Sequence, residues 1–155
     1  MSAYQVFNLG RFTGFVPIEN QYYYAVVAVL LPMAFVAFPA SGRHGVNGMS
    51  WYDFIPFLAT AGVTGTLVFY AIDIVDEGWE FSAPGFMQYL SLAFVLLAIE
   101  ASRRTGGAIV TAIIVIFAIY PLFAGSMPGV LEGTSETLWD TVAYYSLSTE
   151  ALIGI

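Results

Sequence analysis

The chain has 155 residues, of which 59% are hydrophobic, 17% are aromatic and only 10% are charged. Its mean hydropathy is +0.79, far from the composition of soluble globular domains, which indicates a protein embedded in lipid. The formal net charge is −7 and every basic residue is an arginine, which argues against a nucleic acid as partner and against an anionic lipid surface as the main anchor. No cysteine is present, which excludes disulfides and thiolate metal sites.

Residues 1–21 form a leader before the first apolar run. Four aromatic residues in it are spaced loosely like one helical face, and Gly10, Gly14 and Pro17 interrupt that face. The four are Tyr4, Phe7, Phe12 and Phe15. This pattern fits an interfacial segment that lies on the membrane, and it fits a partly ordered tail equally well. A cleaved signal peptide is disfavoured, because the leader is long and lacks the positive charge of such peptides.

Four apolar runs follow, each close to the length that a helix needs to cross the hydrocarbon core. They cover residues 22–38, 54–74, 86–101 and 107–124. Because lipid cannot satisfy exposed backbone polar groups, such runs must be helices. We therefore predict an all-α integral membrane protein of one domain, 1–155, with four transmembrane helices. Residues 125–155 are predicted to form an amphipathic tail with a short helical segment.

The arginines predict the orientation of these spans, since cytoplasmic loops carry the positive excess. Arg43 lies between the first and second runs, while Arg103 and Arg104 lie between the third and fourth. Seven acidic residues lie near or in the segments on the other side: Asp73, Asp76, Glu77 and Glu80 around the end of the second run and before the third, and Glu132, Glu136 and Asp140 after the fourth. Both arginine loops are therefore expected on the cytoplasmic side, with both termini outside.

Ionisable residues within spans are costly and often functional. Glu100 closes the third run, with Arg103 and Arg104 at positions i+3 and i+4, where a helix brings opposite charges together. This predicts an ion pair at a helix end, with a role in a subunit contact or an ion pathway as the alternative. Glu150, in an apolar stretch near residue 155, is the next most suggestive acid.

No pattern for catalysis or cofactor binding is recognisable in the sequence. The single histidine, His44, lies in a glycine-rich loop rather than on a helix that could present it to haem. The sequence therefore predicts no enzyme activity, no cofactor and no metal site. Ala59, Gly62 and Thr66 share one face of the second run, which is the small-residue pattern that lets transmembrane helices pack closely.

An ordered series of short motifs resembles a known family. From the first loop to the third, the motifs are Phe38-Pro39-Ala40-Ser41-Gly42-Arg43, Trp51-Tyr52-Asp53 and Glu100-Ala101-Ser102-Arg103-Arg104. Later motifs are Tyr120-Pro121-Leu122-Phe123, Met127-Pro128-Gly129 and the run from Tyr145 to Ile155. Together they resemble the N-terminal, small-subunit-like part of the fused TRAP transporter permeases, in the branch that uses TAXI-type binding proteins.

The resemblance implies a multi-pass protein of the bacterial cytoplasmic (inner) membrane. In that family a periplasmic binding protein delivers an organic anion, and a sodium gradient drives uptake through a large permease subunit. In the family, hairpins and broken helices that hold substrate and sodium come next along the chain. This sequence does not contain that portion, so no transport residue is assigned. Two hypotheses remain open: a scaffold subunit of a TRAP-type transporter, or an accessory structural subunit of another membrane complex such as a photosynthetic or respiratory one.

Overall fold

The computed structural model describes residues 19–39, 51–129, 132–148 and 150–151, and this part of the chain is helical and contains no strand. The elements are α3 (Glu19–Ala37), α4 (Trp51–Phe69), α5 (Ala71–Asp76), α6 (Gly85–Phe123), the 3₁₀ turn η1 (Ala124–Ser126) and α7 (Leu138–Leu147). The predicted all-α fold is confirmed for these residues. The leader up to residue 18, with the loop that carries Arg43 and His44, lies outside them.

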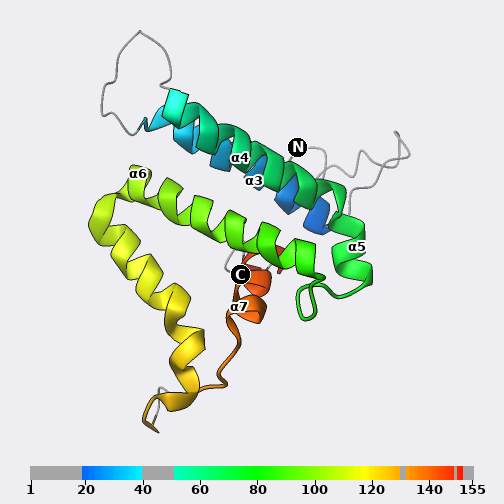
Figure 1. Ribbon diagram of the computed structural model, residues 1–155, viewed down its shortest axis with the longest axis vertical. Helices are drawn as coiled ribbons and strands as arrows, with labels where there is room; N and C mark the ends of the chain where they lie inside the picture. Colours follow the sequence, from blue (N-terminus) through cyan, green and yellow to red (C-terminus); the bar gives the residue numbers. More distant parts are fainter. Residues whose placement is uncertain (1–18, 40–50, 130–131, 149, 152–155) are drawn as a thin grey trace.

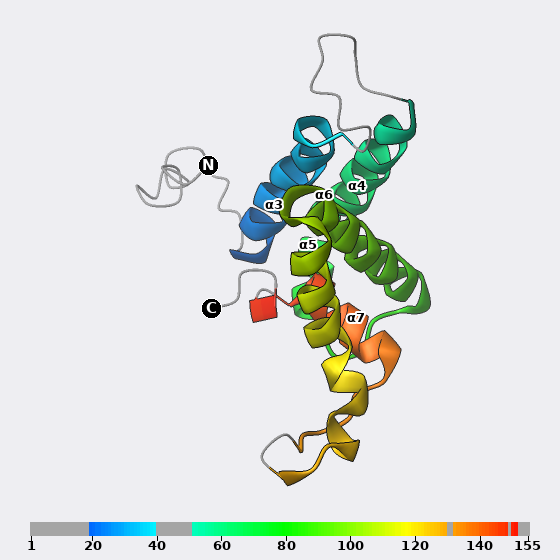
Figure 2. The same ribbon diagram turned by 90° about the vertical axis from the view of Figure 1, so that its left-hand side faces the viewer.

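Three of the described helices, α3, α4 and α6, are long and apolar enough to cross a membrane. The helices α3 and α4 lie side by side and run in opposite directions, and the first half of α6 packs beneath them (Figures 1 and 2). These helices expose large apolar side chains over much of their outer faces, as helices that face lipid do. The arrangement is compatible with a multi-pass membrane protein.

The runs predicted as separate spans at 86–101 and 107–124 lie in one helix, α6, which is broken at Gly107. The break has φ 77° and ψ 177° at Gly107, a backbone conformation that is essentially restricted to glycine. It divides α6 into a proximal arm, residues 85–106, and a distal arm, residues 108–123, which form a V (Figure 1). The expected loop after residue 101 is therefore helical up to the break, because Glu100 and the two arginines stabilise one more turn.

The run predicted at 54–74 is also divided. The helix α4 ends at Phe69, and the short helix α5 begins at Ala71, because Tyr70 leaves the helical region with φ −89° and ψ 10°. The chain then turns through the acidic segment before α6. In the predicted tail, α7 begins where the Thr137 side chain accepts a hydrogen bond from the backbone N–H of Asp140, an N-cap of the usual kind.

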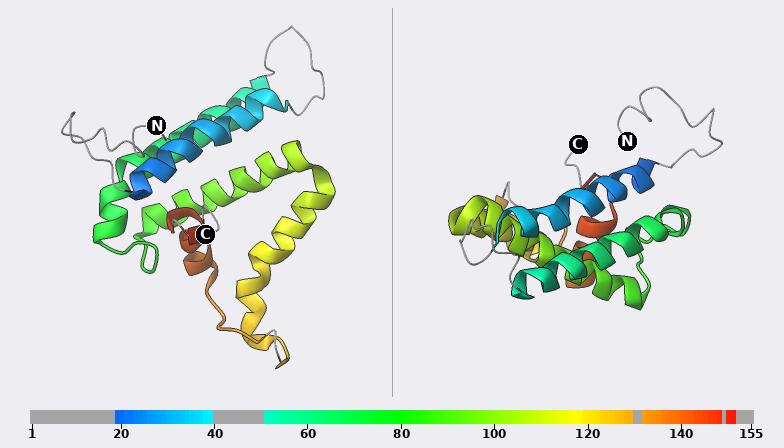
Figure 3. Two further views of the ribbon diagram at one scale, coloured as in Figure 1. Left: turned by 180° about the vertical axis from the view of Figure 1, so that it is seen from behind. Right: turned by 90° about the horizontal axis from the view of Figure 1, so that it is seen from above.

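The core lies where α3, α4, α5, the proximal arm and α7 meet. Its largest fully buried apolar side chains are Tyr24, Leu67, Ile74, Met87 and Leu147. Polar side chains are buried beside them: the hydroxyl of Thr60 donates to Pro56 O at 2.6 Å, and that of Thr64 donates to Thr60 O at 2.7 Å. Because each hydroxyl donates to a carbonyl of the preceding helical turn, it keeps a hydrogen bond when it is buried in an apolar interior. The view from behind shows α7 beside the proximal arm of α6, within the V that the two arms form (Figure 3).

Candidate functional site: an interhelical charge cluster

Four charged side chains gather at the end of the bundle where α4 begins and the proximal arm ends. Arg104 Nη1 lies 2.7 Å from Asp53 Oδ1, and Arg104 Nε lies 2.8 Å from Glu100 Oε1. Arg103 makes a second pair, with its Nε 2.7 Å from Glu100 Oε2 and its Nη2 2.8 Å from Glu100 Oε1. Asp53, Glu100, Arg103 and Arg104 form what we call the charge cluster, in which two carboxylates balance two guanidinium groups.

Burial separates the members of the charge cluster into two classes. Asp53 is fully buried and the Arg104 side chain is 7% exposed, whereas the Arg103 side chain is 53% exposed. The Arg104 guanidinium also lies 4.9 Å from the centre of the Phe35 ring on α3, within the range of a cation–π contact. Arg104 therefore joins α3, α4 and α6 at one point.

The predicted site residues meet partly as expected. Glu100 lies within ion-pair distance of Arg103 and Arg104, because the i+3 and i+4 positions fix that contact locally. The partner that sequence reasoning missed is Asp53. It lies just before the second apolar run, where an acid in a first helical turn normally only complements the helix dipole, and nothing local in the sequence points to Arg104, 51 positions away.

The small residues of α4 lie on the outside of the described chain. Ala59 and Gly62 are exposed, and a Cβ built on Gly62 would meet nothing within 4 Å. The Thr66 hydroxyl donates to Gly62 O at 2.8 Å. Within the chain, α4 instead packs through Thr60, Thr64 and Leu67. The predicted close packing at the small face thus requires a helix that does not belong to the described residues, and it stays a prediction.

A second long-range contact ties the start of α3 to the end of α7. The Tyr24 hydroxyl donates to the backbone O of Leu147 at 2.5 Å, and both residues are buried. Glu150, singled out in the sequence, is exposed and lies 3.5 Å from the Tyr144 hydroxyl, too long for a good hydrogen bond. Glu150 is therefore not a member of any buried network among the described residues.

The charge cluster pairs each of its carboxylates with at least one guanidinium group. These guanidinium groups do not release protons at physiological pH. Across the part of the chain that the structure describes, no three His, Cys, Asp or Glu side chains are grouped so as to hold a metal ion.

Comparison with known proteins finds no matching family model, no matching curated protein and no matching solved structure.

Proposed function

We propose that the chain is a non-catalytic scaffold subunit of a TRAP-type secondary transporter for organic anions, which works only together with a large permease subunit. The proposal rests on where the motifs that resemble the TRAP permeases lie in the structure. Asp53 of Trp51-Tyr52-Asp53 pairs with Arg104 of Glu100-Ala101-Ser102-Arg103-Arg104. Two motifs that carry the resemblance from distant parts of the chain thus contribute the same buried ion pair.

The motif that begins at Tyr145 also contributes a contact between distant helices. Leu147, within the run from Tyr145, accepts the hydrogen bond from Tyr24, which anchors α7 to α3. Residues that carry the resemblance therefore contribute to two polar contacts between distant helices of the described chain. This supports a role in architecture for these motifs, as a scaffold requires.

A scaffold role also fits the electrostatics. Within the candidate membrane spans at 20–37, 52–69 and 85–126, the charged side chains are Asp53, Glu100, Arg103 and Arg104, and they bind one another. A coupling-ion site usually offers uncompensated oxygens near mid-membrane, often at a pair of broken helices. Among the described helices, α6 is interrupted within its length, at Gly107. This break lies three residues from Arg104, a positive charge that a sodium site would not favour.

We further propose that the two arms of α6 cross the membrane separately, which gives four crossings in a bacterial inner membrane. The distal arm has 16 residues between the break and Phe123, close to the short end of the range for a transmembrane helix. In this topology the break and the segment before α4 face the cytoplasm, where arginine is favoured. A large permease and a periplasmic binding protein are the partners.

The test is to purify the tagged chain from its host membranes in a mild detergent and to identify the proteins that remain bound. A large permease should remain bound to the wild-type chain and should dissociate from the Arg104→Ala variant, which lacks the interhelical pair. The exposed-site variant Glu132→Gln is the control. Co-purification with pigment-binding or haem proteins instead would overturn the proposal in favour of an accessory subunit of a photosynthetic or respiratory complex.

A second measurement tests whether Glu100 takes part in transport or only in the architecture of the assembly. In the reconstituted assembly, Glu100→Gln should leave the sodium dependence of uptake unchanged, and any loss of rate should follow the loss of bound subunit. A shifted sodium dependence in an intact assembly would place Glu100 in the transport mechanism and contradict the scaffold role.

A further inference from the structure

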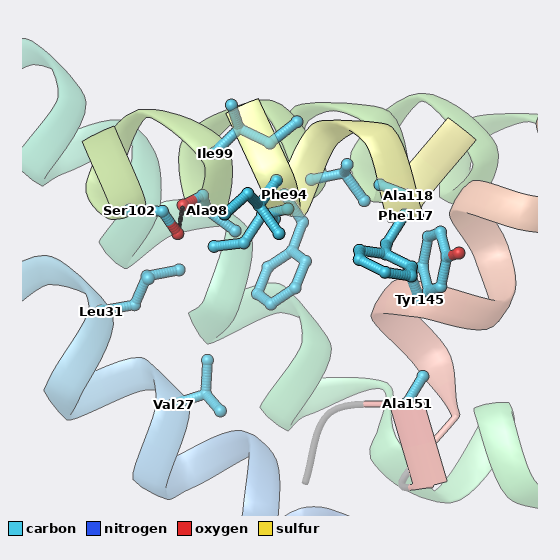
Figure 4. A pocket seen from close by; sticks show the side chains of 13 residues that line it. Val27, Leu31, Phe94, Ala98, Ile99, Ser102, Phe117, Ala118, Tyr145 and Ala151 are labelled. Carbon is cyan, nitrogen blue, oxygen red and sulfur yellow. Dashed lines mark hydrogen bonds between the residues drawn. The ribbon is translucent and has the colours of Figure 1, made fainter. Parts of the chain in front are cut away.

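An apolar groove of about 570 Å³ lies between the two arms of α6. Ala98 and Ser102 line it from the proximal arm, Phe117 and Ala118 from the distal arm, and Val27 from α3, as the close view shows (Figure 4). The groove exists because the break at Gly107 holds the arms apart. Apart from Ser102, whose hydroxyl donates to Ala98 O, the lining from α3 and α6 is hydrocarbon and aromatic.

Tyr145 of α7 lines this groove and also lines a second pocket of about 490 Å³. The second pocket is acidic, since Glu80, Glu136 and Asp140 contribute three carboxyl groups to its wall. Pro121 lines it from the distal arm, one helical turn beyond Ala118. The groove and the pocket thus lie on either side of Tyr145, the groove lined mainly by apolar side chains and the pocket by three acidic ones.

Among the described residues, no arginine forms a salt bridge with these carboxylates, since the salt bridges there belong to the charge cluster. The Tyr145 hydroxyl stays neutral near pH 7, because burial and then the neighbouring Tyr144 raise its pKa. The rings of Tyr144 and Tyr145 therefore stand beside the carboxylates as neutral aromatic surfaces, which attract cations through their faces.

The shape of the groove and the charge of the acidic pocket favour one class of ligand. A metal ion does not fit, because the described carboxylates form no group that could hold one, and a small hydrated cation would make no use of the groove. A phospholipid would bring its phosphate towards three carboxylates, which like charges disfavour. We propose that the groove and the acidic pocket together bind a lipophilic cation, with its apolar body between the arms of α6 and its positive charge beside Glu80, Glu136 and Asp140.

This proposal does not depend on the transporter assignment, and it can be tested on the purified chain in a non-ionic detergent. Equilibrium dialysis with tetraphenylphosphonium should show saturable binding. The anion tetraphenylborate, which has nearly the same shape, should bind far more weakly. Equal binding of the two ions would mean partition into the micelle and would overturn the proposal, as would a co-purified phospholipid that tetraphenylphosphonium does not displace.

Two variants locate the site. Glu80→Gln with Glu136→Gln should weaken binding of the cation by about three- to tenfold, as expected for partly exposed charge pairs. The control Asp76→Asn with Glu132→Gln removes the same charge from exposed positions outside the pocket and should leave binding unchanged. Equal effects of the two double variants would overturn the proposal.

Ala118→Trp fills the groove without a change in charge and should abolish binding, whereas Ala112→Trp, at an exposed position of the same arm outside the groove, should not. Circular dichroism and gel filtration show whether each variant is folded. Undiminished binding to folded Ala118→Trp would contradict the proposal, and the carboxylate variants decide the question if that variant does not fold.

Discussion

The hydroxyl of Tyr24 and the backbone carbonyl of Leu147, separated by 123 positions in the chain, form a buried hydrogen bond of 2.5 Å. It is the polar contact through which α3 holds the end of α7. We expect Tyr24→Phe to destabilise the protein by about 0.5–1.5 kcal/mol and to increase hydrogen exchange in α7 more than elsewhere. Tyr144→Phe is the matched control, since the contact of that hydroxyl among the described residues is the long one to Glu150. Equal exchange in the two variants would show that the bond does not anchor α7.

The ion pair of Asp53 and Arg104 should contribute more. Asp53→Asn leaves part of a buried guanidinium without its carboxylate, which costs about 3–5 kcal/mol where a buried pair loses one member. Unfolding in detergent, followed by circular dichroism, measures the loss. The double variant Asp53→Asn with Arg104→Gln should recover part of the stability, because no buried charge then stands alone.

The exposed half of the charge cluster provides the comparison for this prediction. Arg103→Gln should cost much less than Asp53→Asn, since solvent screens a half-exposed pair. Equal losses would mean that the burial of Asp53 does not govern the energetics of the charge cluster.

How far the sequence predicts these features depends on the distance between the residues involved. The Glu100 contacts follow from helical spacing within one turn, and the lengths of the apolar runs predict helices because lipid leaves the backbone no alternative. The Asp53–Arg104 pair joins two helices, and its register depends on how their side chains pack. Periodicity along one helix contains no information on that register.

The helix boundaries show the same limit. The second apolar run continues through Tyr70 without a change in hydropathy, so its division into α4 and α5 has no signal in composition. Residue type alone predicts the small face of α4, which consists of Ala59, Gly62 and Thr66. The side of α4 that packs inside the chain carries Leu67, which joins the core with Tyr24 of α3 and Ile74 of α5.

Gly107 should tolerate no side chain. Gly107→Ala places a Cβ at φ 77° and should cost about 1–3 kcal/mol, or straighten α6 if the strain is relieved there. Gly85→Ala is the control, because a Cβ there meets nothing within 4 Å and its φ is ordinary. Distances between spin labels on the two arms report the angle of the V. An unchanged angle together with unchanged stability would contradict the role of Gly107.

The proposed topology predicts which loops react with an impermeant thiol reagent on intact cells. Because the chain has no cysteine, single substitutions suffice. Ser82→Cys should be labelled and Gly45→Cys should not. Ser82 is preferred to Gly78, whose φ of 64° disfavours any side chain. The opposite labelling would reverse the orientation and leave the helices unaffected.

The exposed small face of α4 is expected to contact a partner. Gly62→Leu should weaken the assembly by roughly 1–2 kcal/mol, the range of such interhelical contacts in model systems, and should leave the chain itself folded, since nothing described lies within 4 Å of that position. Native gel electrophoresis of the complex measures the effect, with Ile55→Leu, a nearby exposed position, as control. An undisturbed complex would show that this face contacts lipid.

The charge cluster has a consequence for the response of the protein to voltage. Moving one elementary charge across 100 mV of membrane potential involves about 2.3 kcal/mol, so a single buried Asp or Arg would make the position of its helix depend on the energised state of the cell. Because Arg104 pairs with Asp53 and Glu100 pairs with Arg103, the helices carry these four charges with no net charge among them. The membrane potential therefore exerts no net force on these four charges taken together.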